Sequence, residues 1–279
     1  MHIKTCDGVT LYIEKEGAGV PCIYLHGGPG YWSKSFQHFT SEFLHGQLEM
    51  IYLDQRGCGR SRLAENGDYS LERLIRDIEA VRSHLKIEEW YVMGHSFGGL
   101  LAVNYAHLFP EHTKGLILTN STLNMADSFT HQILKGREWL GITEKQNPIN
   151  DTADLVNTFY ATAHQLIEEN LFYKLQFNTP EDEQRLRVID EALSPQPDFQ
   201  QYIFSNEEYF QDFTCLTEKV IVPTFVLSGL FDHAVGPRHQ ESFQFPNGIY
   251  KQLESGHHPY VESPAEFSRA ILEFILDNN

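Results

Sequence analysis

The segment from Trp90 to Leu108 constrains the fold more than any other part of this sequence. An apolar run at Trp90–Gly94 predicts a buried strand, and a second apolar run at Leu100–Leu108 predicts a helix. The residues at the junction, Gly94-His-Ser-Phe-Gly98, form a G-x-S-x-G motif. Glycines at both ends of this motif permit a turn so tight that the central side chain is exposed at the strand end. We therefore predict that Ser96 stands in a strand-to-helix turn as a candidate nucleophile.

Strand-like and helix-like segments alternate along most of the chain. An amphipathic helix is predicted over Leu71–Leu85, where apolar residues recur at helical spacing. Alternation of this kind predicts an α/β fold with a mostly parallel central sheet flanked by helices. The predicted strands are Val9–Glu14, Pro21–His26, Met50–Asp54, Trp90–Gly94, Gly115–Asn120, Val222–Ser228 and Tyr250–Leu253.

The alternation fails between Asn120 and Val222, where the sequence contains helix-like segments such as Ala153–Asn170 and Glu181–Leu193. We therefore predict a core domain of residues 1–121 and 222–279 and an inserted helical cap of residues 122–221. The cap carries 17 acidic and 7 basic residues and many aromatic side chains. This composition suits a wall around an apolar pocket, and it suits an ordinary solvated helix surface over core aromatics equally well.

A serine hydroxyl is a poor nucleophile at neutral pH, so Ser96 requires a base and an acidic residue that orients the base. Beyond the cap, a predicted strand ends near Gly229 and Asp232 follows in a loop, while His257 follows the last predicted strand. We expect Asp232 to hold His257 and His257 to take the proton of Ser96. His258 is the alternative base, and we favour His257 because Gly256 directly precedes it.

Acyl transfer also needs two backbone N–H groups that bind the oxyanion. The first is expected from Phe97, which follows the candidate nucleophile. The second is expected from Gly28, in the run His26-Gly-Gly-Pro-Gly30 after an early strand. This glycine run matches neither common phosphate-binding pattern, G-x-x-x-x-G-K-[ST] or G-x-G-x-x-G.

Together these motifs resemble those of the proline iminopeptidase-like group of α/β hydrolases, over nearly the whole chain. The runs His26-Gly-Gly-Pro-Gly30 and Asp54-Gln-Arg-Gly-Cys-Gly-Arg-Ser61 are fairly characteristic of that group. The segment Gly94–Gly99, the Asp232 loop and the Gly256-His-x-Pro end recur across the superfamily. The resemblance implies an α/β-hydrolase fold and an enzyme that removes an N-terminal residue, often proline, from peptides.

The resemblance also implies acidic residues that hold the free amino group of the peptide. One such glutamate in relatives directly follows the triad aspartate, where this chain has His233. Another lies late in the cap after an asparagine, and Asn206-Glu-Glu-Tyr-Phe210 resembles that stretch. The resemblance therefore points to Glu207 or Glu208, for which a solvated acidic turn is the alternative interpretation. The form Gly94-His-Ser is more usual among general esterases.

These features lead to three hypotheses. The first is a serine hydrolase that works through an acyl-enzyme and releases a small N-terminal residue, such as proline, from peptides. The second is a carboxylester or lactone hydrolase of the same fold. The third is a non-hydrolytic protein of this fold, such as an acyltransferase, a lyase or a ligand-binding protein. The expected substrate is a small molecule or a short peptide.

Net charge and cysteine content limit the partners and the cellular compartment that we expect for this protein. The net charge of −17 disfavours nucleic acid and anionic membranes as partners. The four cysteines form no C-x-x-C pair, and the N-terminal residues have no apolar core of signal-peptide length, so we expect a cytoplasmic protein. No metal-ligand spacing appears, and we expect neither a metal nor another cofactor. Arg56 and Arg60 are expected to tie down their own loop by hydrogen bonds.

Overall fold

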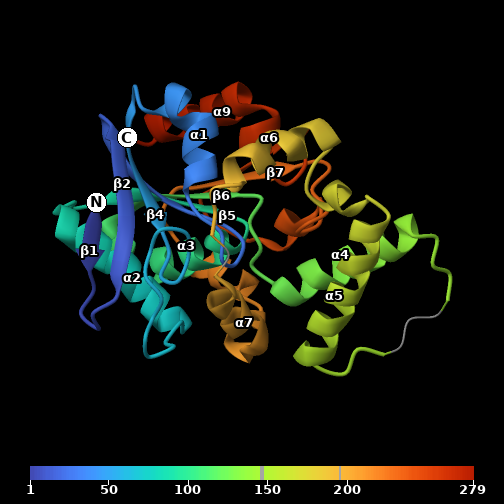
Figure 1. The fold of residues 1–279 in the computed structure, drawn as a ribbon. Helices are drawn as coiled ribbons and strands as arrows, with labels where there is room; N and C mark the ends of the chain where they lie inside the picture. Colours follow the sequence, from blue (N-terminus) through green and yellow to red (C-terminus); the bar gives the residue numbers. More distant parts are fainter. Residues whose placement is uncertain (145–147, 195) are drawn as a thin grey trace.

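A computed structural model describes residues 1–144, 148–194 and 196–279. An eight-stranded sheet with the order β1-β2-β4-β3-β5-β6-β7-β8 forms its centre (Figure 1). Strand β2 runs antiparallel to both of its neighbours, and the pairs from β4 to β8 are parallel. The strands are β1 (His2–Lys4), β2 (Thr10–Gly17), β3 (Val20–Leu25), β4 (Leu48–Asp54), β5 (Trp90–His95), β6 (Thr113–Thr119), β7 (Thr224–Gly229) and β8 (Gly248–Leu253).

Helices cover both faces of the sheet, as expected for parallel strands whose side chains are apolar on both sides. Helices α2 and α3 lie on one face, and α1 and α9 lie on the other (Figure 1). The helices are α1 (Lys34–Leu44), α2 (Leu71–Leu85), α3 (Phe97–Leu108), α4 (Met125–Trp139), α5 (Thr152–Glu168), α6 (Pro180–Asp190), α7 (Pro197–Ser205), α8 (Pro259–Glu262) and α9 (Pro264–Asp277).

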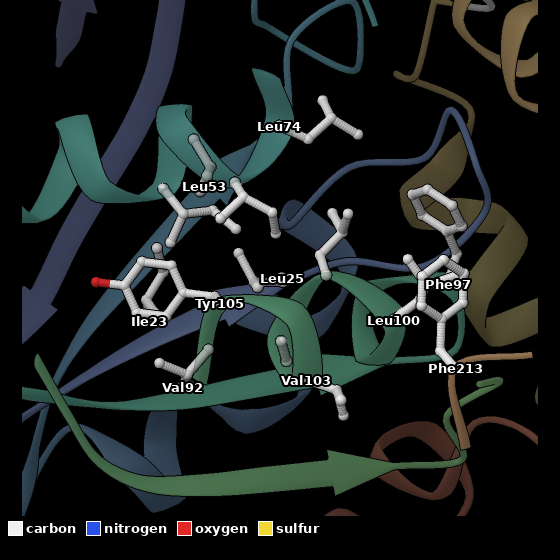
Figure 2. Packing of buried hydrophobic residues seen from close by; sticks show 14 of the residues in the cluster. Ile23, Leu25, Leu53, Leu74, Val92, Phe97, Leu100, Val103, Tyr105 and Phe213 are labelled. Carbon is white, nitrogen blue, oxygen red and sulfur yellow. The ribbon is translucent and has the colours of Figure 1, made fainter. Parts of the chain in front are cut away.

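The period-2 alternation of the strands divides the core into two clusters. In β3, Ile23 and Leu25 belong to the cluster under α2 and α3, whereas Cys22 and Tyr24 belong to the cluster under α1 and α9. Figure 2 shows the first cluster, in which Val103 and other side chains of α3 pack over these strands. Almost every residue of α3 is buried, which explains why its sequence is apolar on all sides.

The structure confirms the predicted α/β-hydrolase fold and the helix at Leu71–Leu85, and each predicted strand overlaps an observed one. Strand β1 was not predicted because it has only three residues, of which only the central Ile3 is buried. The predicted cap helices correspond to α5 and α6, which begin and end within a few residues of the predicted bounds.

The chain between β6 and β7 is helical in the part that the structure describes. Helices α4 to α7 lie here, together with the short 3-10 segments η2 (Phe172–Leu175), η3 (Glu207–Phe210) and η4 (Thr214–Lys219). Helices α4 and α5 pack closely at Gly136, where a Cβ atom would lie 2.6 Å from the Thr162 methyl group. The domain bounds at 121/122 and 221/222 stay a prediction.

One carboxylate of α6 joins the cap to the core. Asp190 Oδ1 accepts hydrogen bonds from the Tyr31 hydroxyl at 2.7 Å, the Trp32 indole at 3.0 Å and the Ser35 hydroxyl at 2.6 Å. Its three donors lie directly after the glycine run that contains Gly28. The position of this loop therefore depends on the docking of α6.

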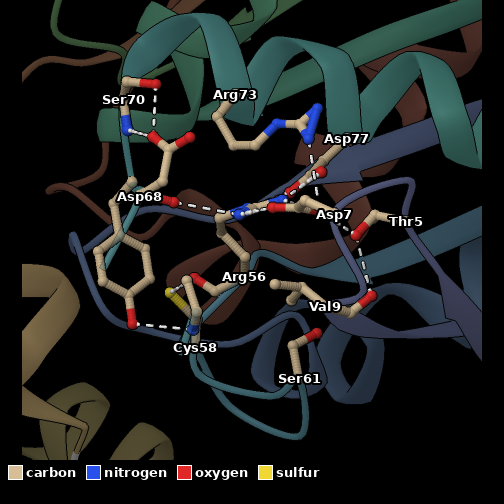
Figure 3. A network of polar contacts seen from close by, with 12 residues as sticks. Thr5, Asp7, Val9, Arg56, Cys58, Ser61, Asp68, Ser70, Arg73 and Asp77 are labelled. Atoms are coloured by element: carbon tan, nitrogen blue, oxygen red, sulfur yellow. Dashed lines mark hydrogen bonds and ion pairs between the residues drawn. The ribbon is translucent and has the colours of Figure 1, made fainter. Parts of the chain in front are cut away.

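The hydrogen bonds of the two arginines confirm their predicted role, and Figure 3 shows those of Arg56. The fully buried Arg56 donates to both carboxylate oxygens of Asp77, at 2.6 and 2.8 Å, and to Asp7 at 2.9 Å. Arg60 donates to Asp54 at 2.7 Å. Both guanidinium groups are thus occupied in holding the loop.

No helix in the described ranges has the length and apolar character needed to cross a membrane.

Candidate active site

Ser96 lies in the strained turn that the sequence predicts, between β5 and α3. Its backbone has φ +53° and ψ −123°, a conformation that L-residues rarely adopt. The turn requires glycine at its ends, because a Cβ atom at Gly98 would lie 2.1 Å from the Leu25 carbonyl oxygen and one at Gly94 would lie 2.4 Å from the Gly98 carbonyl oxygen. The Ser96 N–H donates to the Thr119 carbonyl at 3.2 Å. The fold therefore fixes this serine at the carboxyl edge of the sheet.

Asp232 and His257 form a buried pair at the same edge. The Nδ1 atom of His257 lies 2.9 Å from Oδ2 of Asp232. Asp232 has no exposed surface, and 5% of the His257 surface is exposed. Since Nδ1 faces the carboxylate, Nε2 is the ring nitrogen left for a proton from another group.

Three further groups hold the Asp232 carboxylate. The Asn120 amide donates to Oδ2 at 2.8 Å, and the N–H groups of Ala234 and Val235 donate to Oδ1 at 2.9 and 3.2 Å. Burial by itself raises the pKa of Asp232, but the neighbouring His257 and these hydrogen bonds outweigh burial and lower the pKa to about 2. Asp232 is therefore ionised at neutral pH and can orient the imidazole.

The contacts of the two adjacent histidines distinguish between them. Both ring nitrogens of His258 have partners: Nδ1 lies 2.9 Å from the Tyr260 hydroxyl and Nε2 lies 3.0 Å from Oε1 of Gln176. Burial holds the pKa of His258 well below its ordinary value. His257, in contrast, contacts Asp232 and lines the cavity that contains Ser96. This geometry favours His257 as the base.

Two consecutive carbonyl groups of the cap support the loops that carry Asp232 and His257. The Leu175 carbonyl accepts from the N–H of His233 at 3.1 Å, and the Gln176 carbonyl accepts from the N–H of His257 at 2.7 Å. Gly256 allows this approach, because a Cβ atom there would lie 2.6 Å from the Gln176 carbonyl oxygen. The C-terminal end of η2 and the residue that follows it are thus part of the framework of the site.

A cavity of about 360 Å³ lies between the core and the cap. Ser96, Phe97 and His257 line it together with Gly28, whose φ is +114°. Among the described residues, no hydrogen bond joins the Ser96 hydroxyl to His257, a contact that often forms only once substrate is bound. Phe97 is the first residue of α3, so its N–H lacks an intrahelical acceptor. The predicted nucleophile, base and oxyanion donors therefore surround one space.

The wall of this cavity contributed by the cap is mostly apolar and has no charged side chain among the described residues. Helices α4 and α5 supply most of it, and Phe129 and Phe159 stack there with ring centroids 4.4 Å apart. None of the described residues that line the cavity is Asp, Glu, Lys or Arg. The polar part of the lining includes three glutamines, Gln132, Gln176 and Gln200.

The structure does not bring Glu207 and Glu208 into this cavity. Both belong to η3, where Glu207 is exposed and Glu208 is half-buried. The Asn206 side chain caps η3 by accepting from the Glu208 N–H at 3.1 Å, so this acidic stretch forms a capped turn. Burial raises the pKa of the Glu208 carboxyl. The geometry matches the alternative interpretation of an acidic turn.

His233 also lies outside the described lining of the cavity. Its Nδ1 atom lies 3.1 Å from Nε2 of His131 on α4, and its ring packs edge-on against Trp139. His233 thus contacts helix α4 of the cap. No cluster of three or more His, Cys, Asp or Glu side chains suited to a metal ion occurs among the residues described.

Two residues of the site were not identified from the sequence. Asn120 was predicted only as a strand residue, although an asparagine at a strand end with positive φ, here +47°, is a feature of turns. Gln176 carries no sequence signal, because its place beside the histidines depends on how the cap packs.

Comparison with known proteins places this architecture among hydrolases. Residues 20–264 match the model of the alpha/beta hydrolase fold family. The chain is 26% identical to a proline iminopeptidase of Heyndrickxia coagulans over 275 residues, which are 94% of this chain and 92% of that protein. It is 39% identical over 125 residues to a proline iminopeptidase of Arabidopsis thaliana, a match that covers 42% of this chain and only 31% of the relative.

Solved structures share the whole fold. A proline iminopeptidase-related protein from Thermus thermophilus superposes with a TM-score of 0.83 at 22% identity, covering 99% of this chain and 96% of that chain. A thermophilic esterase from Thermogutta terrifontis has a TM-score of 0.75 at 22% identity, covering 100% of this chain and 99% of that chain. The relatives confirm the predicted resemblance, and the solved structures show the common fold.

Proposed function

The chain belongs to the alpha/beta hydrolase fold family, and from this premise we propose that it is a serine hydrolase that works through an acyl-enzyme. Ser96 is the nucleophile, His257 the general base and Asp232 the residue that orients the base. The support is the Asp232–His257 pair, 2.9 Å apart, beside a cavity that both His257 and Ser96 line. The N–H groups of Gly28 and Phe97 are the oxyanion donors in this proposal.

The proposed reaction has two halves. Ser96 Oγ forms a bond to the carbonyl carbon while its proton passes to Nε2 of His257, and the oxyanion is bound by the two backbone donors. The bond to the leaving group then breaks, and His257 returns the proton to the departing alcohol or amine. Water attacks the acyl-enzyme, with its proton passing to His257, and the acid and free Ser96 are released.

Our proposal for the substrate class follows from the uncharged lining of the cavity. An ammonium group that enters a cavity lined by apolar side chains and neutral amides loses hydration without gaining a counter-charge. A neutral acyl group gains free energy from the same lining, because its apolar surface leaves water. We therefore propose that the substrates are uncharged carboxylesters or lactones.

Removal of an N-terminal residue from peptides is the second candidate. It is supported by the sequence similarity to proline iminopeptidases, which reaches 94% of the chain in one relative. This activity requires a group that accepts the free ammonium, and neither Glu207 nor Glu208 is among the described lining residues. The two candidates share Ser96, His257 and Asp232, and differ in how the substrate is recognised.

The test compares short p-nitrophenyl esters with prolyl and alanyl p-nitroanilides, using the wild type and Ser96→Ala. Ser128→Ala is the matched control, since Ser128 lines the same cavity and its hydroxyl bonds to Thr122. We expect ester turnover that Ser96→Ala abolishes and Ser128→Ala retains. Turnover that survives Ser96→Ala contradicts the nucleophile assignment.

The nitroanilides decide between the two candidates. Cleavage of aminoacyl nitroanilides with free but not blocked amino groups would establish the aminopeptidase. Labelling of Ser96 by a fluorophosphonate without turnover of either series would instead indicate a non-hydrolytic member, such as an acyltransferase, a lyase or a ligand-binding protein.

A further inference from the structure

Three glutamines line the cavity, and each uses one end of its amide to contact the protein. Gln132 donates through Nε2 to the Ala234 carbonyl at 2.7 Å, and Gln200 donates to the Pro29 carbonyl at 3.5 Å. Gln176 differs, because its Oε1 atom is the one engaged, by Nε2 of His258 at 3.0 Å. Gln176 is therefore the glutamine whose N–H groups are turned away from its protein partner.

The direction of the amide follows from the hydrogen-bond chain behind it. A neutral imidazole donates from one nitrogen and accepts at the other. Since Gln176 Oε1 can only accept, Nε2 of His258 carries the proton, and Nδ1 accepts from the Tyr260 hydroxyl at 2.9 Å. Tyr260 and His258 are both buried, and burial keeps His258 neutral by lowering its pKa. The chain Tyr260–His258–Gln176 is thus fully paired when the Oε1 end of the amide faces His258.

The donor end of Gln176 is accessible, and the residue lines two hollows: the cavity that contains Ser96 and a smaller one between η2 and α6. Its Nε2 atom has no hydrogen-bond partner among the described residues, and it is not among the buried polar atoms that lack one. The backbone of the same residue is fixed beside the base, because its carbonyl accepts from the His257 N–H at 2.7 Å. Gln176 thus lines the cavity that contains Ser96 and His257, and no described residue engages the N–H groups of its side-chain amide.

We propose that Gln176 determines specificity by donating a hydrogen bond from its side-chain amide to an uncharged oxygen of the substrate near the scissile bond. The substrate class is an ester or lactone that carries a second neutral acceptor, such as an ether or carbonyl oxygen. A free ammonium group is a donor and finds no acceptor on this amide. This inference rests on the proposed hydrolase function.

The experiment uses two isosteric pairs of substrates in which an ether oxygen replaces one methylene. The acyl pair is p-nitrophenyl methoxyacetate and p-nitrophenyl butanoate, and the alcohol pair is 2-methoxyethyl acetate and butyl acetate. The readout is the ratio of kcat/KM for the ether to kcat/KM for the alkane. Within one preparation this ratio does not depend on the fraction of the enzyme that is folded. Dividing the ratio of a variant by the ratio of the wild type cancels the intrinsic reactivity of each ester.

Two variants remove the donor in different ways. Gln176→Glu keeps an acceptor for His258 and replaces the amide N–H groups by a carboxylate oxygen, while Gln176→Met removes donor and acceptor without adding charge. We expect both to lower the ether-to-alkane ratio about 10-fold in at least one pair, which is the effect of one lost hydrogen bond. The pair that responds identifies the side of the scissile bond that Gln176 contacts.

Gln200→Glu is the matched control, because it places the same charge in the lining of the same cavity. We expect it to leave both ratios as in the wild type. Ratios that stay unchanged in both pairs for both Gln176 variants overturn the proposal, as does an equal fall in Gln200→Glu. Failure of the proposed hydrolase function gives a different result from failure of the proposal for Gln176, because the wild type then hydrolyses none of the four esters.

Discussion

The Nδ1 atom of His257 and Oδ2 of Asp232 lie 2.9 Å apart, and the pair is supported from the cap through a hydrogen bond of 2.7 Å between the His257 N–H and the Gln176 carbonyl. The cap therefore does more than cover the cavity. It shares the hydrogen bonds that hold the loops of Asp232 and of the proposed base, His257, so changes in the cap are expected to alter turnover as well as substrate choice.

Replacement of Asp232 by asparagine is expected to lower kcat/KM for esters by roughly 10³- to 10⁴-fold, because the imidazole loses the carboxylate that orients it and stabilises its protonated form. The measurement is steady-state ester hydrolysis at neutral pH. Asp212→Asn, in an exposed turn of the cap, is the control. A loss of less than about 10-fold would contradict the role of Asp232.

The same variant is expected to change the dependence of stability on pH. The pKa of Asp232 is about 2 in the folded protein and about 3.8 when unperturbed, so its ionised form stabilises the fold above pH 4. This contribution, about 2 kcal/mol, is lost as the pH falls from 4 through 2. Urea unfolding across this range should give a smaller decrease of the free energy of unfolding for Asp232→Asn than for the wild type.

The strained backbone of Ser96 leads to a prediction about stability. Ser96→Gly and Ser96→Ala both remove the proposed nucleophile, but only glycine adopts φ +53° and ψ −123° without a Cβ penalty. We expect Ser96→Gly to be more stable than Ser96→Ala by about 1 kcal/mol, after the entropy cost of glycine in the unfolded chain is subtracted. Equal midpoints of urea unfolding would show that the turn stores no strain.

Asn120 combines a hydrogen bond to Asp232 at 2.8 Å with φ +47°. Asn120→Gly removes the hydrogen bond to Asp232 and a second one to the Gly256 carbonyl at 3.0 Å, whereas Asn120→Ala removes both and also places an alanine at positive φ. We expect Asn120→Gly to lose about 2 kcal/mol, the cost of a buried hydrogen bond to a charged group, and Asn120→Ala to lose about 1 kcal/mol more. Thermal and urea unfolding of the two variants measure the difference, and the reverse order would contradict it.

Asp190 is expected to control the docking of α6. Asp190→Asn weakens the hydrogen bonds from Tyr31, Trp32 and Ser35, so hydrogen exchange in residues 180–190 should become faster. Because these donors follow the loop that contains Gly28, ester turnover should fall as well. The neighbouring exposed residue provides the control Glu191→Gln, which should leave both unchanged. Exchange as slow as in the wild type would place the anchor of α6 elsewhere.

Local patterns in the sequence were sufficient to predict the sheet and the site loops. The alternation of apolar segments predicted the strands, because each strand buries side chains on both faces of the sheet. The motif around Ser96 predicted a strained turn, because only glycines at positions 94 and 98 permit the close backbone contacts found there. Chain order then suggested that Asp232 and His257 meet, since parallel strands end at one edge of the sheet.

The cap was predictable as helical but not in its contacts. Helical propensity and capping residues are local properties, so α5 and α6 could be identified from the sequence. The direction in which each helix presents its side chains depends on packing against the core. The family resemblance pointed to Glu207 or Glu208 near the substrate, with a solvated acidic turn as the alternative, and the structure places both in a capped turn outside the described cavity lining.

The sequence by itself determined the α/β fold and the turn at Ser96, because both depend on patterns among residues close together in the chain. It also determined the order in which the candidate triad residues occur along the chain. Only the tertiary structure distinguished the contacts of His257 from those of His258 and brought Asn120 and Gln176 to the candidate site. The physical reason is that a hydrogen-bond partner from a distant segment is selected by the packing of whole elements, which no local pattern encodes.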